Sequence, residues 1–243
     1  MTTIPTVFVH PALAHAGIWR GVCAYMALAE RPVLVDLLGH GRAGDWDGQA
    51  DYSDVALAAL LAVLPDEPCH LIGHSLGGAL SLRLALEHPD RIARLSLIEP
   101  VLFAAAAGTQ AHRDHLTFFA PFQEAFEAGD RETPTRQFTA HWGSGENWDK
   151  LPAPQRAYLT DRIHIIPATG AFLEQDRSQL LGAGRLEALA IPTTLIRGSA
   201  SPAIVGAIHC GLLGRSSMTE LLIDGAAHMM SVTHPAELAA ALA

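Results

Sequence analysis

The spacing of hydrophobic residues changes repeatedly along the chain, and each change predicts a boundary between a strand and a helix. Short apolar runs typical of buried strands occupy residues 6–9, 32–35, 69–72, 92–98, 191–197 and 221–223. Helical spacing occupies residues 17–29, 53–64, 76–86 and 118–128, and Pro235 opens a terminal helix. Strands that alternate with helices of this length predict an α/β fold, with a mostly parallel central sheet flanked by helices.

This alternation is absent between residues 102 and 186. The segment nevertheless contains most of the large aromatic residues of the chain, namely Phe118, Phe119, Phe122, Phe126, Phe138, Trp142, Trp148 and Phe172. A helical segment needs some of these rings for its own core, but as a set they favour an apolar pocket wall. We therefore predict a core formed by residues 1–102 and 187–243, with a helical insertion at 103–186.

The sequence Gly73-His74-Ser75-Leu76-Gly77 lies where the third strand passes into a helix. It fits the pattern G-x-S-x-G, in which a sharp turn lifts the serine hydroxyl above the sheet. Side chains two residues before and after the serine would collide in such a turn, so glycine is needed at both places. The turn also directs the Leu76 N–H, at the positive end of the helix, toward an oxyanion beside Ser75. The alternative is a glycine-rich turn that contains a serine by chance.

With these features the chain resembles the α/β-hydrolase family over nearly its whole length. The matching pieces are residues 7–11, 33–36, 39–41, 73–77, 95–100 and 225–228. The resemblance implies an α/β-hydrolase fold in which 103–186 is a helical cap inserted after the strand that ends at Glu99. It also places a second oxyanion donor after the first strand. Because Pro11 has no N–H, that donor is the Ala12 N–H, with Leu13 as the alternative.

A serine hydroxyl is a weak nucleophile at neutral pH and needs a base, which a third group must orient. His228 lies on a loop after the last strand, and the order serine, acid, histidine matches the resemblance. We therefore predict Ser75 as the nucleophile and His228 as the base. The alternative for His228 is a structural histidine held by hydrogen bonds.

The acid is not at the place where the family usually has an aspartate, because Ser201 stands there after the penultimate strand. We predict that Glu99 replaces it, since some branches of the family take the acid from the tip of that strand. Its side chain is one methylene longer than that of aspartate, which suits the reach to His228. Asp224, Glu174 and Asp176 stay open as alternatives, and so does the absence of any acid.

The other polar candidates receive binding or structural roles. We predict a substrate pocket lined by Leu13, His74, Phe119, Trp142 and Met229. His10, Asp36 and His40 are expected to hold loops. His112 and His115 have the spacing of a metal pair, but no third ligand accompanies them, so we expect them on a solvated helix face. No metal site and no cofactor are predicted.

Composition narrows the classes of partner. The 243 residues carry a net charge of −9, and their 16 Lys and Arg residues form no block, which argues against nucleic acid and anionic membrane surfaces. Cys23, Cys69 and Cys210 are interpreted as small buried residues. The start of the chain lacks the pattern of a signal peptide, and the longest apolar run is far shorter than the about 20 residues that span a bilayer. We therefore expect a cytoplasmic protein.

These observations together predict a serine hydrolase that cleaves carboxylic ester bonds of small apolar substrates through an acyl-enzyme. Its partner is a small-molecule ester. The same residues also suit a lactone, a thioester or a carbon–carbon bond, and a protein that binds an apolar ligand without catalysis is a further alternative. The sequence leaves open whether copies of the chain form a homo-oligomer.

Overall fold

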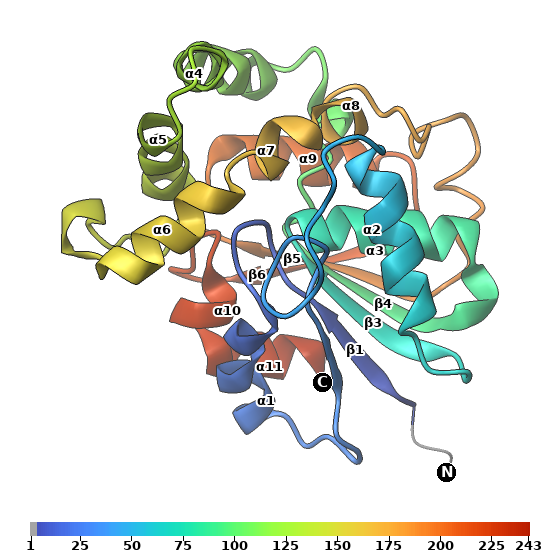
Figure 1. Ribbon diagram of the computed structural model, residues 1–243. Helices are drawn as coiled ribbons and strands as arrows, with labels where there is room; N and C mark the ends of the chain where they lie inside the picture. Colours follow the sequence, from blue (N-terminus) through green and yellow to red (C-terminus); the bar gives the residue numbers. More distant parts are fainter. Residues whose placement is uncertain (1–3) are drawn as a thin grey trace.

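The computed structural model describes residues 4–243 and is built around one six-stranded sheet (Figure 1). The strands are β1 (Thr6–Val9), β2 (Val33–Val35), β3 (Cys69–His74), β4 (Ile92–Ile98), β5 (Thr193–Gly198) and β6 (Thr219–Ile223). Their order in the sheet is β2-β1-β3-β4-β5-β6, and every pairing is parallel. The predicted α/β fold with a parallel sheet is therefore confirmed.

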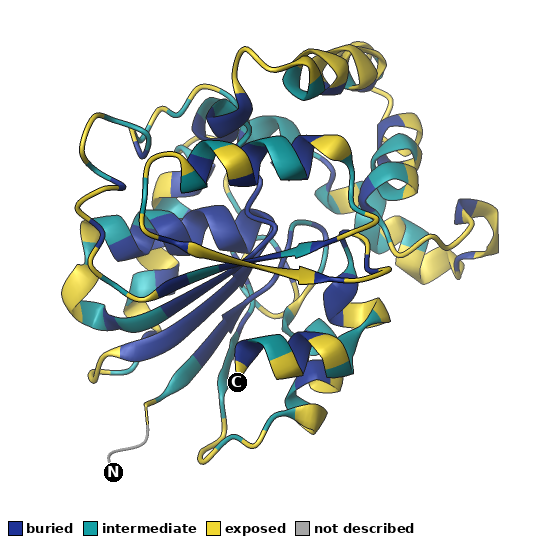
Figure 2. Cartoon of the chain, turned by 180° about the vertical axis from the view of Figure 1, so that it is seen from behind, coloured by how far each residue is buried: buried dark blue, intermediate teal, exposed yellow. Residues whose placement is uncertain are grey.

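Helices cover both faces of this sheet, because alternate strand residues point to opposite sides. One face packs against α2 (Tyr52–Ala62), α3 (Leu76–Glu87) and α9 (Ala203–Leu213). The other packs against α1 (Arg20–Tyr25), α10 (Met230–Thr233) and α11 (Pro235–Leu242). In β1, for example, Val7 and Val9 join the first core and Phe8 the second. Figure 2 shows the central strands buried between these layers.

Several element boundaries differ from the sequence prediction. Helix α2 begins at Tyr52 rather than at Ser53, because the Asp51 carboxylate caps it by accepting the N–H groups of Ser53 and Asp54. The helix expected at 17–29 is a 3₁₀ turn, η1 (Ala16–Trp19), followed by the short α1. It ends early because the backbone of Met26 is extended. The cysteine prediction holds for the buried Cys69 but is wrong for the exposed Cys210.

The segment between β4 and β5 is helical, and the described residues form no strand there. Its helices are η3 (Phe103–Ala106), α4 (Gln110–Glu127), α5 (Glu132–Trp142), η4 (Trp148–Lys150), α6 (Ala153–Arg162), α7 (Ile165–Ala168) and α8 (Gly170–Leu173). Helix α4 begins at Gln110, well before the expected residue 118, since the Thr109 hydroxyl caps it. In Figure 1, α4, α5 and α6 stand away from the sheet, at the upper left.

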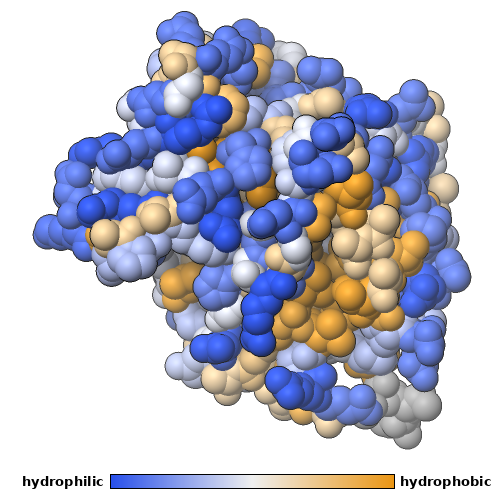
Figure 3. All heavy atoms as spheres, in the orientation of Figure 1, coloured by the Kyte–Doolittle hydropathy of each residue, from blue (hydrophilic) through white to orange (hydrophobic). Residues whose placement is uncertain are grey.

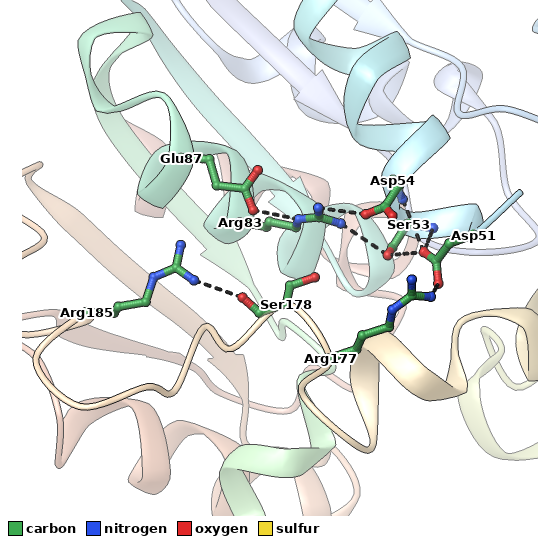
Figure 4. Close-up of polar contacts among 8 residues, drawn as sticks. All are labelled: Asp51, Ser53, Asp54, Arg83, Glu87, Arg177, Ser178 and Arg185. Atoms are coloured by element: carbon green, nitrogen blue, oxygen red, sulfur yellow. Dashed lines mark hydrogen bonds and ion pairs between the residues drawn. The ribbon is translucent and has the colours of Figure 1, made fainter.

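A cluster of ion pairs and hydrogen bonds connects the end of this segment to the helices on the sheet (Figure 4). Arg83 of α3 pairs with Asp54 of α2 at 2.7 Å and with Glu87 at 2.8 Å. Arg177, which follows α8, pairs with Asp51 at the start of α2. The cluster therefore joins the segment after α8 to the start of α2.

The surface beside α2 is more apolar than the rest of the visible face (Figure 3). A groove of about 430 Å³ lies there between α2 and the edge strand β2. Its walls include Val33, Leu38, Ala59 and Val63. No helix within residues 4–243 is both long enough and apolar enough to cross a membrane.

Candidate active site

Ser75 occupies a strained turn between β3 and α3, with φ 56° and ψ −118°. A non-glycine residue adopts this conformation only where the surroundings enforce it. A Cβ atom at Gly73 would lie 2.4 Å from the Gly77 carbonyl oxygen, and one at Gly77 would lie 2.5 Å from that of His10. Both glycines are therefore required by close backbone contacts, and the turn is the expected nucleophile elbow in its geometry.

The close approach of Gly77 to Val9 and His10 brings the loop after β1 beside the first turn of α3. Leu76 is the first residue of α3, so its N–H has no acceptor within the helix. The Leu13 N–H is donated to His40 Nε2 at 3.0 Å. No hydrogen bond within residues 4–243 engages the Ala12 N–H. Ala12 and Leu76 therefore offer two N–H groups at this corner, whereas Leu13, the alternative donor, is already engaged.

Two buried histidines hold the loop in this position. His10 Nε2 accepts the Leu37 N–H at 2.9 Å, and its Nδ1 donates to the Pro11 carbonyl at 2.7 Å. His40 donates through Nδ1 to the Leu38 carbonyl at 3.0 Å. Burial lowers the pKa of His10 to about 3 and that of His40 to about 4. Both rings are therefore neutral, which leaves Nε2 of each free to accept a backbone N–H.

His228 and Glu99 form a buried pair. Glu99 lies at the tip of β4, and its Oε2 accepts a hydrogen bond from His228 Nδ1 at 2.7 Å. Burial alone would raise the pKa of Glu99, but its hydrogen bonds to His228, the Gly198 N–H and Ser201 lower it below its ordinary value. Glu99 is therefore a carboxylate at neutral pH, and it can stabilise a positive imidazole.

The three alternative acids lie elsewhere. Asp224 is exposed and accepts a hydrogen bond from the Ser199 hydroxyl at 3.0 Å. Asp176 accepts the N–H groups of Leu180 and Leu181. Glu174 bonds with two histidines of α4. Within the described chain, Glu99 is the carboxylate that contacts His228.

A small, mostly apolar cavity of about 80 Å³ lies at the candidate active site. Ser75 and His228 both line it, as do Ala12, Leu13, Trp142 and Met229. Phe119, also expected in the pocket, instead lines a separate cavity between the helices of the insertion. A serine in a strained turn and an imidazole paired with a buried carboxylate at one cavity, with the Ala12 N–H in its wall, are groups that acyl transfer would use.

His74 was expected in the pocket wall, but it is fully buried and does not line the cavity. Its Nε2 donates to the His228 carbonyl at 2.9 Å, and its Nδ1 accepts from the Ser231 hydroxyl at 3.3 Å. Burial and the neighbouring His228 lower the pKa of His74 to about 3. The neutral ring thus supports the loop that carries His228.

A sequence profile of the alpha/beta hydrolase fold matches residues 5–235. The chain belongs to the alpha/beta hydrolase fold family. The lipase LipV of Mycobacterium tuberculosis is 41% identical to this member of the family over 98 residues, which are 39% of this chain and 36% of LipV. A pimeloyl-[acyl-carrier protein] methyl ester esterase of Aeromonas hydrophila is 30% identical over 177 residues, 66% of each chain.

The chain thus spans about a third of the length of LipV and about two thirds of that of the esterase. Among solved structures, NosK from Streptomyces actuosus matches this hydrolase with a TM-score of 0.67 and 26% identity. That match covers 99% of this chain and 96% of NosK.

Ser201 was not predicted to contribute to the site, yet its hydroxyl donates a hydrogen bond to Glu99 Oε1 at 2.5 Å. The Gly198 N–H donates to the same oxygen at 2.8 Å. Strands β4 and β5 are parallel neighbours with Ile98 opposite Ile196, so their tips meet. The adjacency of β4 and β5 could have predicted this contact, because it brings position 201, where the family usually has its aspartate, within reach of a carboxylate at the tip of β4.

The sequence prediction was also wrong for His115, which is buried rather than solvated. His115 Nε2 lies 3.0 Å from Glu174 Oε1, and His112 Nε2 lies 3.3 Å from Glu174 Oε2. No group of three or more His, Cys, Asp or Glu residues within 4–243 is arranged to hold a metal ion.

Proposed function

We propose that this α/β-hydrolase is a serine hydrolase that cleaves carboxylic esters of small, mostly apolar molecules through an acyl-enzyme. The observation that carries the proposal is the buried Glu99–His228 pair, whose imidazole faces the same cavity as Ser75. The names of the relatives, a lipase and a methyl ester esterase, support it.

In this mechanism the Ser75 hydroxyl attacks the ester carbonyl carbon while His228 takes its proton. Glu99 stabilises the resulting imidazolium, and the N–H groups of Leu76 and Ala12 bind the oxyanion. His228 then gives the proton to the departing alkoxide, which leaves as the alcohol. Water, deprotonated by His228, attacks the acyl-enzyme and releases the carboxylic acid, and the proton returns to Ser75.

The substrate class follows from the cavity and from the insertion. The cavity beside Ser75 is small and mostly apolar, so the group next to the ester carbonyl is small and uncharged. Residues 103–186 act as a cap over it, since Phe138, Trp142 and Leu159 of this segment line the cavity opposite Ser75. Lactones, thioesters and carbon–carbon bonds would use the same residues, and a substrate panel distinguishes them.

Labelling with a fluorophosphonate tests the nucleophile, because this probe reacts with an activated serine. We expect the wild-type protein to be labelled at Ser75 by peptide mapping, and Ser75→Ala to lose both the label and the hydrolysis of p-nitrophenyl acetate by about 10⁶-fold. Ser199→Ala, which removes an exposed serine after β5, is the matched control and keeps both. Equal labelling of the wild type and Ser75→Ala would refute the proposal.

A further inference from the structure

A second cavity, open to the surface, is lined by residues of α4, α5 and the segment from α7 to α8. Figure 1 shows where these helices lie in the insertion. The volume of this cavity is about 280 Å³. We call it the insertion chamber, and its walls include Phe103, His115, Phe119, Phe122, Trp142 and Gly170. Five of these six side chains are aromatic rings, counting the imidazole, so the chamber suits hydrocarbon or aromatic groups.

Only the wall that contains Trp142 and Phe138 separates the insertion chamber from the catalytic cavity, because both residues line both spaces. The Trp142 ring lies 4.6 Å from the His228 ring, centroid to centroid. The same ring lies 6.4 Å from the ring of His115 and 6.2 Å from that of Phe103. The Trp142 indole is therefore in contact range of the base and of two residues of the chamber wall.

The volumes show what each space can hold. An apolar cavity of about 150 Å³ accommodates a benzene molecule. The catalytic cavity, at about 80 Å³, is smaller than this benzene-sized cavity. The insertion chamber, at about 280 Å³, is nearly twice the size of the benzene-sized cavity. A long apolar arm therefore does not fit in the catalytic cavity alone. The insertion chamber has room for it, and so does a wider cavity of about 550 Å³ that shares Leu13, Leu159 and Met229 with the catalytic cavity.

The far wall of the chamber is held in place, whereas Trp142 lacks a polar anchor. Glu174 bonds both His112 and His115, and the His115 ring stacks on Phe103 at 4.1 Å. The indole N–H of Trp142 makes no hydrogen bond within the described residues, unlike that of Trp148, which bonds Glu132 at 3.4 Å. Trp142 is thus held in the wall by packing alone.

We infer that the insertion chamber binds one apolar arm of the ester and that Trp142 is the partition which this arm displaces. The inference rests on the proposed ester hydrolysis and assigns its substrate class: esters with an arm of medium-length hydrocarbon or an aromatic ring. His115 adds a polar point to the chamber, since its Nδ1 is buried without a partner in the described chain. The arm is either the acyl chain or the alcohol, and two ester series distinguish them.

The test measures kcat/KM for p-nitrophenyl esters from acetyl to octanoyl, and for acetates from ethyl to octyl alcohol. Gly170→Leu fills the chamber, because a Cβ atom at Gly170 meets nothing within 4 Å and the backbone there is helical. Trp142→Ala removes the partition. Trp148→Phe is the matched control, since it changes a buried tryptophan of the insertion that lines neither space.

In one of the two series we expect Gly170→Leu to lower the ratio of long-arm to short-arm kcat/KM by about tenfold. Each buried methylene is worth about a factor of four, so the loss of two gives this size. Trp142→Ala raises the same ratio by a similar factor, and Trp148→Phe leaves it unchanged. The series that responds identifies the arm.

Unchanged ratios in both series for both variants, with Ser75-dependent turnover retained, would overturn the role of the chamber and leave the proposed function standing. A wild-type protein that shows no Ser75-dependent turnover of any ester would instead overturn the proposed function, and the chamber inference with it. Gly170→Leu adds a side chain to open space, so we expect it to fold. It therefore tests the inference even if Trp142→Ala does not fold.

Discussion

The carboxylate of Glu99 uses both oxygens. Oε2 faces His228, while Oε1 accepts hydrogen bonds from Ser201 and from the Gly198 N–H. The side chain is fully buried, so these bonds replace the water that an exposed carboxylate would bind. Two fixed donors on one oxygen hold the other at Nδ1 of the base. The strand tip of β4 can therefore supply the orientation that an aspartate after β5 usually gives.

Glu99→Gln tests this arrangement at the level of one atom. The amide keeps the size of the side chain but cannot stabilise an imidazolium, and it favours the wrong tautomer of His228. We expect kcat for a short ester to fall by about 10⁴-fold. Circular dichroism and the melting temperature check that the fold is retained.

Ser201→Ala is the matched variant for Glu99→Gln. It removes one donor to Oε1 but keeps the charge and the Gly198 N–H, so its loss should be only about 10- to 100-fold, the worth of one hydrogen bond to a charged group. If kcat of Glu99→Gln fell by less than tenfold, the acid of the triad would have to be another residue. Equal losses in the two variants would show that Glu99 acts through packing and not through its charge.

The elbow involves three elements. It is the turn between the end of β3 and the start of α3, and the end of β1 packs against it. Gly77 is the contact that fixes their distance, because its Cα approaches the carbonyl groups of Val9 and His10. This approach brings the loop after β1 against the first turn of α3. The oxyanion donors that we propose, Ala12 and Leu76, would therefore depend on the packing of α3 against β1.

Gly77→Ala should separate the two oxyanion donors. The new Cβ would lie 2.5 Å from the His10 oxygen and 2.6 Å from that of Val9, so α3 or the loop must shift. We expect kcat to fall by about 10²–10³-fold, as for the loss of one oxyanion donor, together with a lower melting temperature. Gly44→Ala, where a Cβ meets nothing within 4 Å, is the control and should match the wild type. Wild-type kcat in Gly77→Ala would contradict the geometry proposed for the donors.

The elements differ in how well the sequence predicts them, for reasons that the packing explains. Strands β1 and β4 have their expected bounds, because parallel strands covered on both faces are mostly apolar runs. Helix α6 was not predicted, because none of its residues is buried and its sequence is polar overall. The start of α2 depends on a cap at Asp51 rather than on apolar spacing.

The residues of the candidate site also differ in how well the sequence predicts them. Ser75 and His228 belong to local patterns and were predicted, and Glu99 followed from its place at a strand tip. Ser201 and the support that His74 gives to the His228 loop depend on contacts between segments far apart in the chain. Local sequence patterns do not predict such contacts. The adjacency of the tips of β4 and β5 was the feature that could have indicated the contact of Ser201.

At the scale of the whole molecule, four buried histidines are kept neutral in the folded protein. Burial lowers the pKa of His10 and His74 to about 3 and that of His40 and His70 to about 4. Three of them support the active-site loops. His70 lies at the start of β3, where its Nε2 bonds the Ser96 hydroxyl at 2.9 Å.

This burial predicts a protein that is sensitive to mild acid. In the unfolded chain a histidine has a pKa of about 6.5, so below that pH the unfolded state binds more protons than the folded state. The free energy of unfolding therefore falls as the pH drops from about 6.5 toward 4, at up to about 1.4 kcal/mol per pH unit for each group. Four groups give a slope of about 5 kcal/mol per pH unit, which is large against a total stability of about 5–15 kcal/mol.

Urea unfolding between pH 7 and pH 5, followed by circular dichroism, measures this slope. His70→Gln removes one buried imidazole away from the active site, so its slope should be lower than that of the wild type by about 1.4 kcal/mol per pH unit. His15→Gln, at an exposed histidine, should keep the wild-type slope. If His70→Gln and the wild type lost stability equally with acid, burial of neutral histidines would not be its cause. The stability would then have to depend on the carboxylates, such as Glu99, whose lowered pKa places their protonation at more acidic pH.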